Sequence, residues 1–267
     1  MVSSLAGLDF FDTASYKELK IMPLIHLAKK DRETGENSGV LILQDGFFSP
    51  RKCYYFSNLT GSTENLLYFF YAKPAYKDPQ GYEPSDPPIV FVMAPENAPI
   101  RVFPFDTGAF FGKRYAYALG DNYKDEYDLM EFQMPTEMRK ISKYINALWK
   151  NNVSYYRDKP HISKTITQIG NSYVKALIRL IKAPVSHKCD ERKHTVEVQF
   201  DNDIQLKGSL KAIIIAQRIL DKNPVIMDKI SSLKATLIYY RDNGGYSLSE
   251  FFYKEIDQYY RKNGYFR

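Results

Sequence analysis

The chain has 267 residues, which is enough for one large domain or two closely packed ones with a sizeable core. Its hydrophobic content of 44% and charged content of 25% are typical of a folded protein, and no apolar run approaches the roughly 20 residues that span a bilayer. The net charge of +6 permits a nucleic-acid partner without requiring one. The first residues lack the pattern of a secretory signal, so we expect a cytoplasmic protein without a membrane segment.

The residues that usually bind metals are sparse and scattered. The two cysteines, Cys53 and Cys189, form neither a disulfide framework nor a zinc pattern, and the four histidines lack metal-ligand spacing. The chain also lacks a glycine-rich phosphate loop, a Gly-x-Ser-x-Gly motif and a His-Glu-x-x-His motif. We therefore expect no bound catalytic metal.

The first two thirds of the chain predict mainly strands and loops. A short strand is expected over 24–27, and the run 39–46 predicts a short helix that ends at Gly46. The proline-rich stretch 74–88 predicts an extended surface loop. Further strand-like runs, which are aromatic or continuously apolar, lie at 53–56, 66–71, 89–93 and 100–103.

Helices are expected after residue 135. One begins near Pro135 and has apolar residues at helical spacing, namely Met138, Ile141, Ile145 and Leu148. Further helices are expected over 172–181, 210–220, 225–240 and 247–264. The sequence thus predicts an α+β protein with a mixed or antiparallel sheet and helices appended at the C-terminus. A domain boundary is expected near residue 207.

The segment 190–200 joins a charged run to a strict alternation of apolar and polar residues. In a strand, side chains two apart share one face, so Val196, Val198 and Phe200 would point into a core. The opposite face would then carry Thr195, Glu197, Gln199 and Asp201. Taken alone, this pattern predicts a half-solvated edge strand. An acid beside an amide on one face also fits a site that holds a polar ligand.

Three other segments are candidates for chemistry. His26 lies inside a short apolar strand, where a lone histidine is most often a core residue. In the run 67–76, alternation places Tyr71 and Lys73 on one side, either for sheet packing or for a shared ligand. Asp106 lies between large apolar residues and before a glycine, which fits a turn held by backbone amides or a site residue.

Taken in chain order, these segments resemble the ADP-ribosyltransferase fold, specifically its histidine–tyrosine–glutamate branch and the DNA-targeting bacterial toxin transferases. The resemblance covers residues 23–203 and rests on His26, on Ile-Leu-Gln-Asp-Gly ending at Gly46, on Leu-Tyr-Phe-Phe-Tyr-Ala-Lys-Pro around Tyr71, and on Thr-Val-Glu-Val-Gln around Glu197. It implies a split sheet, with residues 1–207 as a catalytic domain and residues 208–267 as a helical extension packed on it.

The resemblance implies that NAD is a substrate whose nicotinamide–ribose bond breaks through a state with oxocarbenium character. Glu197 would stabilise that charge through the ribose 2′-hydroxyl, and His26 would orient the adenosine-side ribose. Tyr71 would stack on nicotinamide, with Tyr68 and Tyr76 as alternatives. The resemblance further gives NAD contacts to Lys73, Tyr76, Asp106 and Arg192, and acceptor contacts to Thr195, Gln199 and Asp190.

The acceptor and partners are implied more broadly. The basic stretch 139–193 makes DNA or RNA a candidate acceptor, beside protein side chains. By family resemblance alone, the protein would be a bacterial toxin or antiviral defence effector that an antitoxin or regulatory protein holds inactive.

Two other functions remain open on the sequence. A metal-dependent nuclease of the restriction-endonuclease type would use Glu197 and Gln199, with Asp190 or Asp106, to hold Mg²⁺ against a phosphate. A nucleic-acid-binding module without enzymatic activity would stack bases on a tyrosine-rich face.

Overall fold

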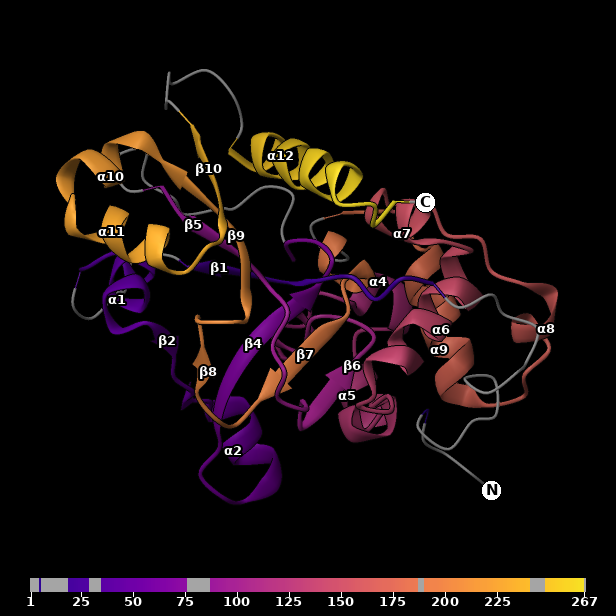
Figure 1. Cartoon of the computed structure of the whole chain (residues 1–267). Coiled ribbons are helices and arrows are strands. Elements are labelled where there is room, and N and C mark those ends of the chain that lie inside the picture. Colours follow the sequence, from indigo (N-terminus) through magenta and orange to yellow (C-terminus); the bar gives the residue numbers. More distant parts are fainter. Residues whose placement is uncertain are drawn as a thin grey trace.

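The computed structural model describes residues 5, 19–28, 35–75, 87–186, 190–240 and 248–266. The fold is α+β, as predicted, and its centre is one mixed, mostly antiparallel sheet of eight strands (Figure 1). Within the described residues, no helix combines the length and apolar character needed to cross a bilayer.

The strands follow an order across the sheet that differs from their order in the chain. Across the sheet they are β10 (Thr236–Tyr240), β9 (Leu210–Ala216), β5 (Ile89–Met93), β1 (Leu24–Ala28), β4 (Asn65–Tyr71), β7 (Glu197–Phe200) and β6 (Arg101–Phe103), with β3 (Arg51–Lys52) paired to β4. All pairs along this path are antiparallel except β9 with β10. A separate two-stranded sheet joins β2 (Phe47–Phe48) to β8 (Ile204–Gln205).

The sheet divides between β1 and β4. These strands pair at only two positions, Leu24 with Tyr71 and Ile25 with Phe70. Beyond them, β1 continues along β5 as far as Ala28, while β4 continues along β7. The two halves of the sheet therefore separate at this point, and the space between them must be filled by other elements or by a ligand.

Helices surround the sheet in three groups (Figure 1). Between β6 and β7 the chain forms α3 (Thr107–Phe111), α4 (Ala116–Leu119), α5 (Tyr123–Glu126), η3 (Leu129–Phe132), α6 (Met138–Trp149), α7 (Asn152–Tyr156), α8 (Lys164–Thr167), α9 (Ser172–Lys182) and η4 (Glu191–His194). Near β9 and β10 lie α1 (Ser38–Asp45), α10 (Gln217–Lys222), α11 (Val225–Ser232) and α12 (Leu248–Lys262). The helix α2 (Tyr54–Thr60) lies at the lower edge of Figure 1, and its Tyr55 and Phe56 rings contact Phe111 of α3.

Local sequence explains why α1 forms and where it packs. The Asn37 side chain accepts the Gly39 amide at 3.0 Å, and Gly46 ends the helix in the left-handed region, at φ 85°. At Gly39 a Cβ atom would lie 2.8 Å from the Cβ of Ile89, so only glycine lets α1 approach β5 this closely. The predicted helix over 39–46 is confirmed.

Two expectations for the C-terminal part are wrong. The run 210–220 is strand β9 followed by α10, and 225–240 is α11 followed by β10. A continuous apolar run suits a buried strand as well as a helix, and β9 has both a β5 and a β10 neighbour to pair with. The extension over 208–267 is therefore not purely helical, because it adds two strands to the main sheet. The last helix, α12, forms as predicted.

Two further expectations are wrong nearer the site. The run 53–56 begins helix α2 rather than a strand, because the chain reverses after β3 and Gly61 ends the helix at φ 72°. The strand β7 is not an edge strand, since it pairs with β4 on one side and β6 on the other. All four of its residues, Glu197–Phe200, are buried.

Candidate functional site

A cavity of about 910 Å³ lies at the division between β1 and β4. Its lining comes from β1, α1, residues 47–56, β4, the start of α3, and β7. The lining includes His26, Tyr68, Asp106 and Glu197, which carry groups suited to chemistry. Ligand sites are commonly cavities of roughly 300–1,000 Å³ with few polar groups, so this cavity is the candidate site.

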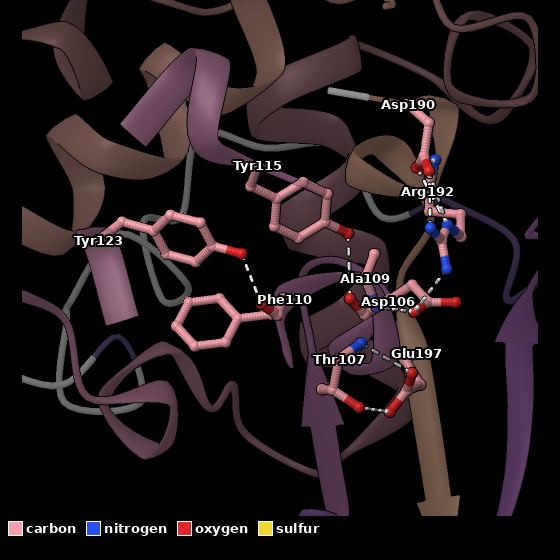
Figure 2. Close-up of polar contacts among 9 residues, drawn as sticks. All are labelled: Asp106, Thr107, Ala109, Phe110, Tyr115, Tyr123, Asp190, Arg192 and Glu197. Carbon is pink, nitrogen blue, oxygen red and sulfur yellow. Dashed lines mark hydrogen bonds and ion pairs between the residues drawn. The ribbon is translucent and has the colours of Figure 1, made fainter. Parts of the chain in front are cut away.

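Glu197 lies at the inner wall of the cavity with both carboxylate oxygens hydrogen-bonded. It is paired in register with Phe70 of β4 and Phe103 of β6, and only 2% of it is exposed. Thr107 donates its backbone amide to Oε2 at 3.0 Å and its hydroxyl to Oε1 at 2.7 Å (Figure 2). The Gln199 amide donates to Oε1 at 2.6 Å. These donors fix the orientation of the carboxylate.

The protonation of Glu197 is finely balanced. Burial and the nearby Asp106 raise its pKa to about 8, while the hydrogen bonds from Gln199 and Thr107 act in the opposite direction. A carboxyl group with a pKa near neutrality, held in a cavity, is suited to exchanging a proton or to stabilising a positive charge that develops nearby.

Asp106 links the cavity to a charged pair behind it. Its side chain caps α3 by accepting the Ala109 amide at 2.6 Å, and its Oδ1 lies 3.9 Å from a guanidinium nitrogen of Arg192. Arg192 in turn is held by Asp190, at 2.6 Å and 3.0 Å (Figure 2). Burial raises the pKa of Asp106 although Arg192 opposes this. Asp190 and Arg192 do not line the cavity, so they support Asp106 from outside it.

His26 is a neutral ring at the point where the sheet divides. Its Nδ1 lies 2.8 Å from the Tyr68 carbonyl, and since a carbonyl only accepts, Nδ1 carries the proton. Burial, with a smaller effect from the Arg51 charge, lowers the pKa of His26 to about 4. Nε2 is then a hydrogen-bond acceptor at neutral pH. The rings of Phe48 and Phe69 pack against His26 at 4.9 Å and 5.4 Å.

Of the two candidate tyrosines that the structure describes, Tyr68 lines the cavity and Tyr71 does not. Its hydroxyl donates to the Cys53 sulfur at 2.7 Å, and burial raises its pKa well above the ordinary value. Tyr71 lies on the other face of β4, fully buried, where its hydroxyl accepts the Met22 amide at 2.9 Å. Tyr76 lies outside the described residues.

Lys73 belongs to a buried ion-pair network away from the cavity. It is 1% exposed, and its ammonium group donates to the Tyr155 carbonyl at 3.0 Å and contacts Asp158. Asp158 also lies 3.5 Å from Nδ1 of His194. Burial alone would raise the pKa of Asp158, but Lys73 and His194 hold it well below its ordinary value. The structure thus places Lys73 in packing rather than at the cavity.

The remaining predicted acceptor residues lie behind the cavity wall. Thr195 and Gln199 are buried, and neither lines the cavity. Gln199 acts on the site only through its hydrogen bond to Glu197. Within the part of the chain that the structure describes, no three His, Cys, Asp or Glu side chains are grouped to hold a metal ion.

Several site residues were not foreseen from the sequence. They are Thr107, and at the mouth of the cavity Arg51, Lys52, Tyr54 and Tyr55. Thr107 had one available signal, because it follows Asp106, whose predicted turn implies free amides in the next residues. The mouth residues had none, since no element was expected for Arg51 and Lys52, and Tyr54 and Tyr55 were expected in a strand over 53–56 rather than in α2.

Neither family models, curated proteins nor solved structures gave a match to this chain.

Proposed function

We propose that this chain is an NAD-dependent ADP-ribosyltransferase that binds NAD in the cavity between β1 and β4. One observation carries the proposal. The cavity joins a histidine on β1, a tyrosine on β4 and a buried, hydrogen-bonded carboxylate, Glu197, on β7, at a division of the sheet. This is the chain order and the split sheet that the sequence resemblance implies.

The chemistry assigned to Glu197 follows from its surroundings. When the nicotinamide–ribose bond breaks, its electron pair leaves with nicotinamide and positive charge develops on the ribose. An ionised carboxylate that holds the ribose 2′-hydroxyl stabilises that charge, and a buried site strengthens the effect. The three donors around Glu197 lower its pKa, but burial and Asp106 outweigh them and raise the pKa to about 8, so we expect the rate to increase as pH rises toward that value. The acceptor nucleophile then bonds to the ribose carbon and releases its proton.

The other roles are assigned from the cavity lining. Tyr68 takes the nicotinamide-stacking position that we expected for Tyr71, and Nε2 of His26 accepts a ribose hydroxyl. Arg51 and Lys52 take the diphosphate, which we expected near Arg192, because among the described residues they are the cations that line the cavity. The proposal includes an acceptor that is either nucleic acid or protein. It also includes a role as a toxin or defence effector that a regulatory partner holds inactive.

The proposal is tested with labelled NAD, incubated with the protein and DNA, RNA or cell lysate, with and without EDTA. We expect label transfer or nicotinamide release that EDTA does not affect and that Glu197→Gln reduces at least about 100-fold. Glu64→Gln is the matched control, because Glu64 pairs with Arg101 and does not line the cavity. Metal-dependent cleavage of nucleic acid without NAD would instead show the nuclease alternative to be correct.

A further inference from the structure

Helix α2 exposes an unusual number of aromatic and apolar side chains. Tyr54 is 67% exposed, Tyr55 56% and Leu59 43%, and no other helix in the described part of the chain exposes as many large apolar residues. Clustered exposed apolar surface usually marks a binding site rather than packing. The helix lies at the lower edge of Figure 1, and Tyr54 and Tyr55 line the mouth of the cavity.

Tyr55 already forms half of a stack. Its ring lies parallel to that of Phe111, with 9° between the planes and 5.0 Å between the centroids. Phe111 is partly buried against the core and also contacts Phe56 edge-on, so the inner layer of the stack is held in place. Because Tyr55 remains exposed, a third planar ring can continue the stack at the cavity mouth.

Two cations line the same cavity as this stack. Arg51 and Lys52 form β3, directly before α2, and both are exposed and line the cavity. The Lys52 ammonium group lies 5.0 Å from the centroid of the Tyr54 ring. The mouth thus combines stacking rings with positive charge, which is the combination that binds a base together with its phosphate.

We infer that the Tyr55–Phe111 stack, with Arg51 and Lys52, is a nucleotide subsite at the mouth of the cavity, where a base stacks on Tyr55 and a phosphate contacts the two cations. The inference rests on the proposed function, since it concerns the same cavity. A base with its phosphate could come from either of two molecules. One is the adenosine diphosphate half of NAD, and the other is a nucleotide of a single-stranded acceptor.

The test measures equilibrium binding of ADP, and of single-stranded DNA and RNA of about ten nucleotides, in the absence of NAD. We expect Tyr55→Ala to weaken binding about 10-fold or more, Tyr55→Phe to restore it, and Lys52→Ala to weaken it and reduce its salt dependence. Tyr239→Ala is the matched control, because Tyr239 is 59% exposed on β10 and does not line the cavity. Tm measurements verify that each variant folds.

The two arms identify the source of the nucleotide. Weakened ADP binding in Tyr55→Ala assigns the subsite to NAD, whereas an effect confined to oligonucleotides assigns it to the acceptor. Binding of neither ligand, or binding that Tyr55→Ala leaves unchanged, overturns the inference. If the wild-type protein binds the nucleotides but does not cleave NAD, the proposed function is refuted and the subsite is not. If the protein cleaves NAD but Tyr55→Ala changes neither the KM for NAD nor the binding of oligonucleotides, the subsite is refuted and the proposed function is not.

Discussion

Thr107 donates two hydrogen bonds to the carboxylate of Glu197, one from its backbone amide at 3.0 Å and one from its hydroxyl at 2.7 Å. The two residues come from opposite ends of the helical segment that separates β6 from β7. Thr107 follows Asp106, the residue that caps α3, so one turn both begins a helix and aims two donors at the cavity wall. The orientation of Glu197 therefore depends on how this turn is built.

Replacement of Thr107 by valine removes the hydroxyl and keeps the shape and the backbone amide. A hydrogen bond to a charged group is worth about 1.5–3 kcal/mol, so we expect NAD cleavage to fall roughly 10- to 100-fold. The pKa of Glu197 should rise further, which moves the acidic limb of the pH–rate profile upward. Thr107→Ser should retain most of the activity and the original profile. A valine variant with wild-type rate and profile would show that Thr107 does not position Glu197.

Glu197→Gln should make the protein more stable at alkaline pH even though it removes activity. Because the folded-state pKa of Glu197 is about 8 against an ordinary 4.5, the folded state binds this proton more tightly than the unfolded state. The stability from this group is present at low pH and is lost as pH rises through about 8. A neutral glutamine does not titrate, so the free energy of unfolding of Glu197→Gln does not fall with pH for this reason. The difference in stability from the wild type therefore grows with pH and reaches on the order of a few kcal/mol.

The measurement is Tm as a function of pH, from about 5 to about 9, where each kcal/mol shifts Tm by about 2–4 °C in a protein of this size class. Glu64→Gln gives a contrast of opposite sign, because the hydrogen bond from Arg101 lowers the pKa of Glu64. That variant should lose stability at neutral pH. Parallel Tm curves for wild type and Glu197→Gln would contradict the raised pKa.

Lys73→Met should destabilise the fold without a specific loss of NAD affinity. The change leaves Asp158 buried without its main cation, which typically costs about 3–5 kcal/mol. Denaturant unfolding measures the loss, and Lys73→Met combined with Asp158→Asn should recover part of it. Lys229→Met, at an exposed position on α11, is the control. A stable Lys73→Met variant with a raised KM for NAD would instead show that Lys73 takes part in NAD binding.

Much of the sheet could be predicted because local pattern and tertiary context agree there. The runs at 24–27, 66–71, 89–93 and 100–103 are apolar or aromatic, and all became strands of the main sheet. The prediction for 210–220 was wrong because its apolar residues suit a helix and a buried strand equally, and only pairing with β5 decides between them. The prediction of a strand over 53–56 was wrong for a similar reason, since the helix that includes this run ends at Gly61, outside the run.

The site was predicted in part for the same reason. Alternation identified Glu197 and Gln199 as neighbours on one face, and in the structure Nε2 of Gln199 lies 2.6 Å from Oε1 of Glu197. It could not determine which face of β4 meets Glu197, because that depends on strand register. Phe70 lies opposite Glu197, which places Tyr68 rather than Tyr71 on the cavity side. A shift of one residue in this register would have reversed the assignment.

The assignment of Tyr68 gives a direct test of that register. Tyr68→Ala should raise the KM for NAD about 10-fold or more, because a stacked ring contributes roughly 1–3 kcal/mol. Tyr68→Phe keeps the ring and loses only the hydrogen bond to Cys53, so its KM should stay close to that of the wild type. Tyr71→Phe should instead lower stability by about 1 kcal/mol, through loss of the bond from Met22, and leave KM unchanged. Steady-state NAD cleavage and denaturant unfolding on the three variants separate the roles, and an unchanged KM for NAD in Tyr68→Ala would show that nicotinamide does not stack on Tyr68.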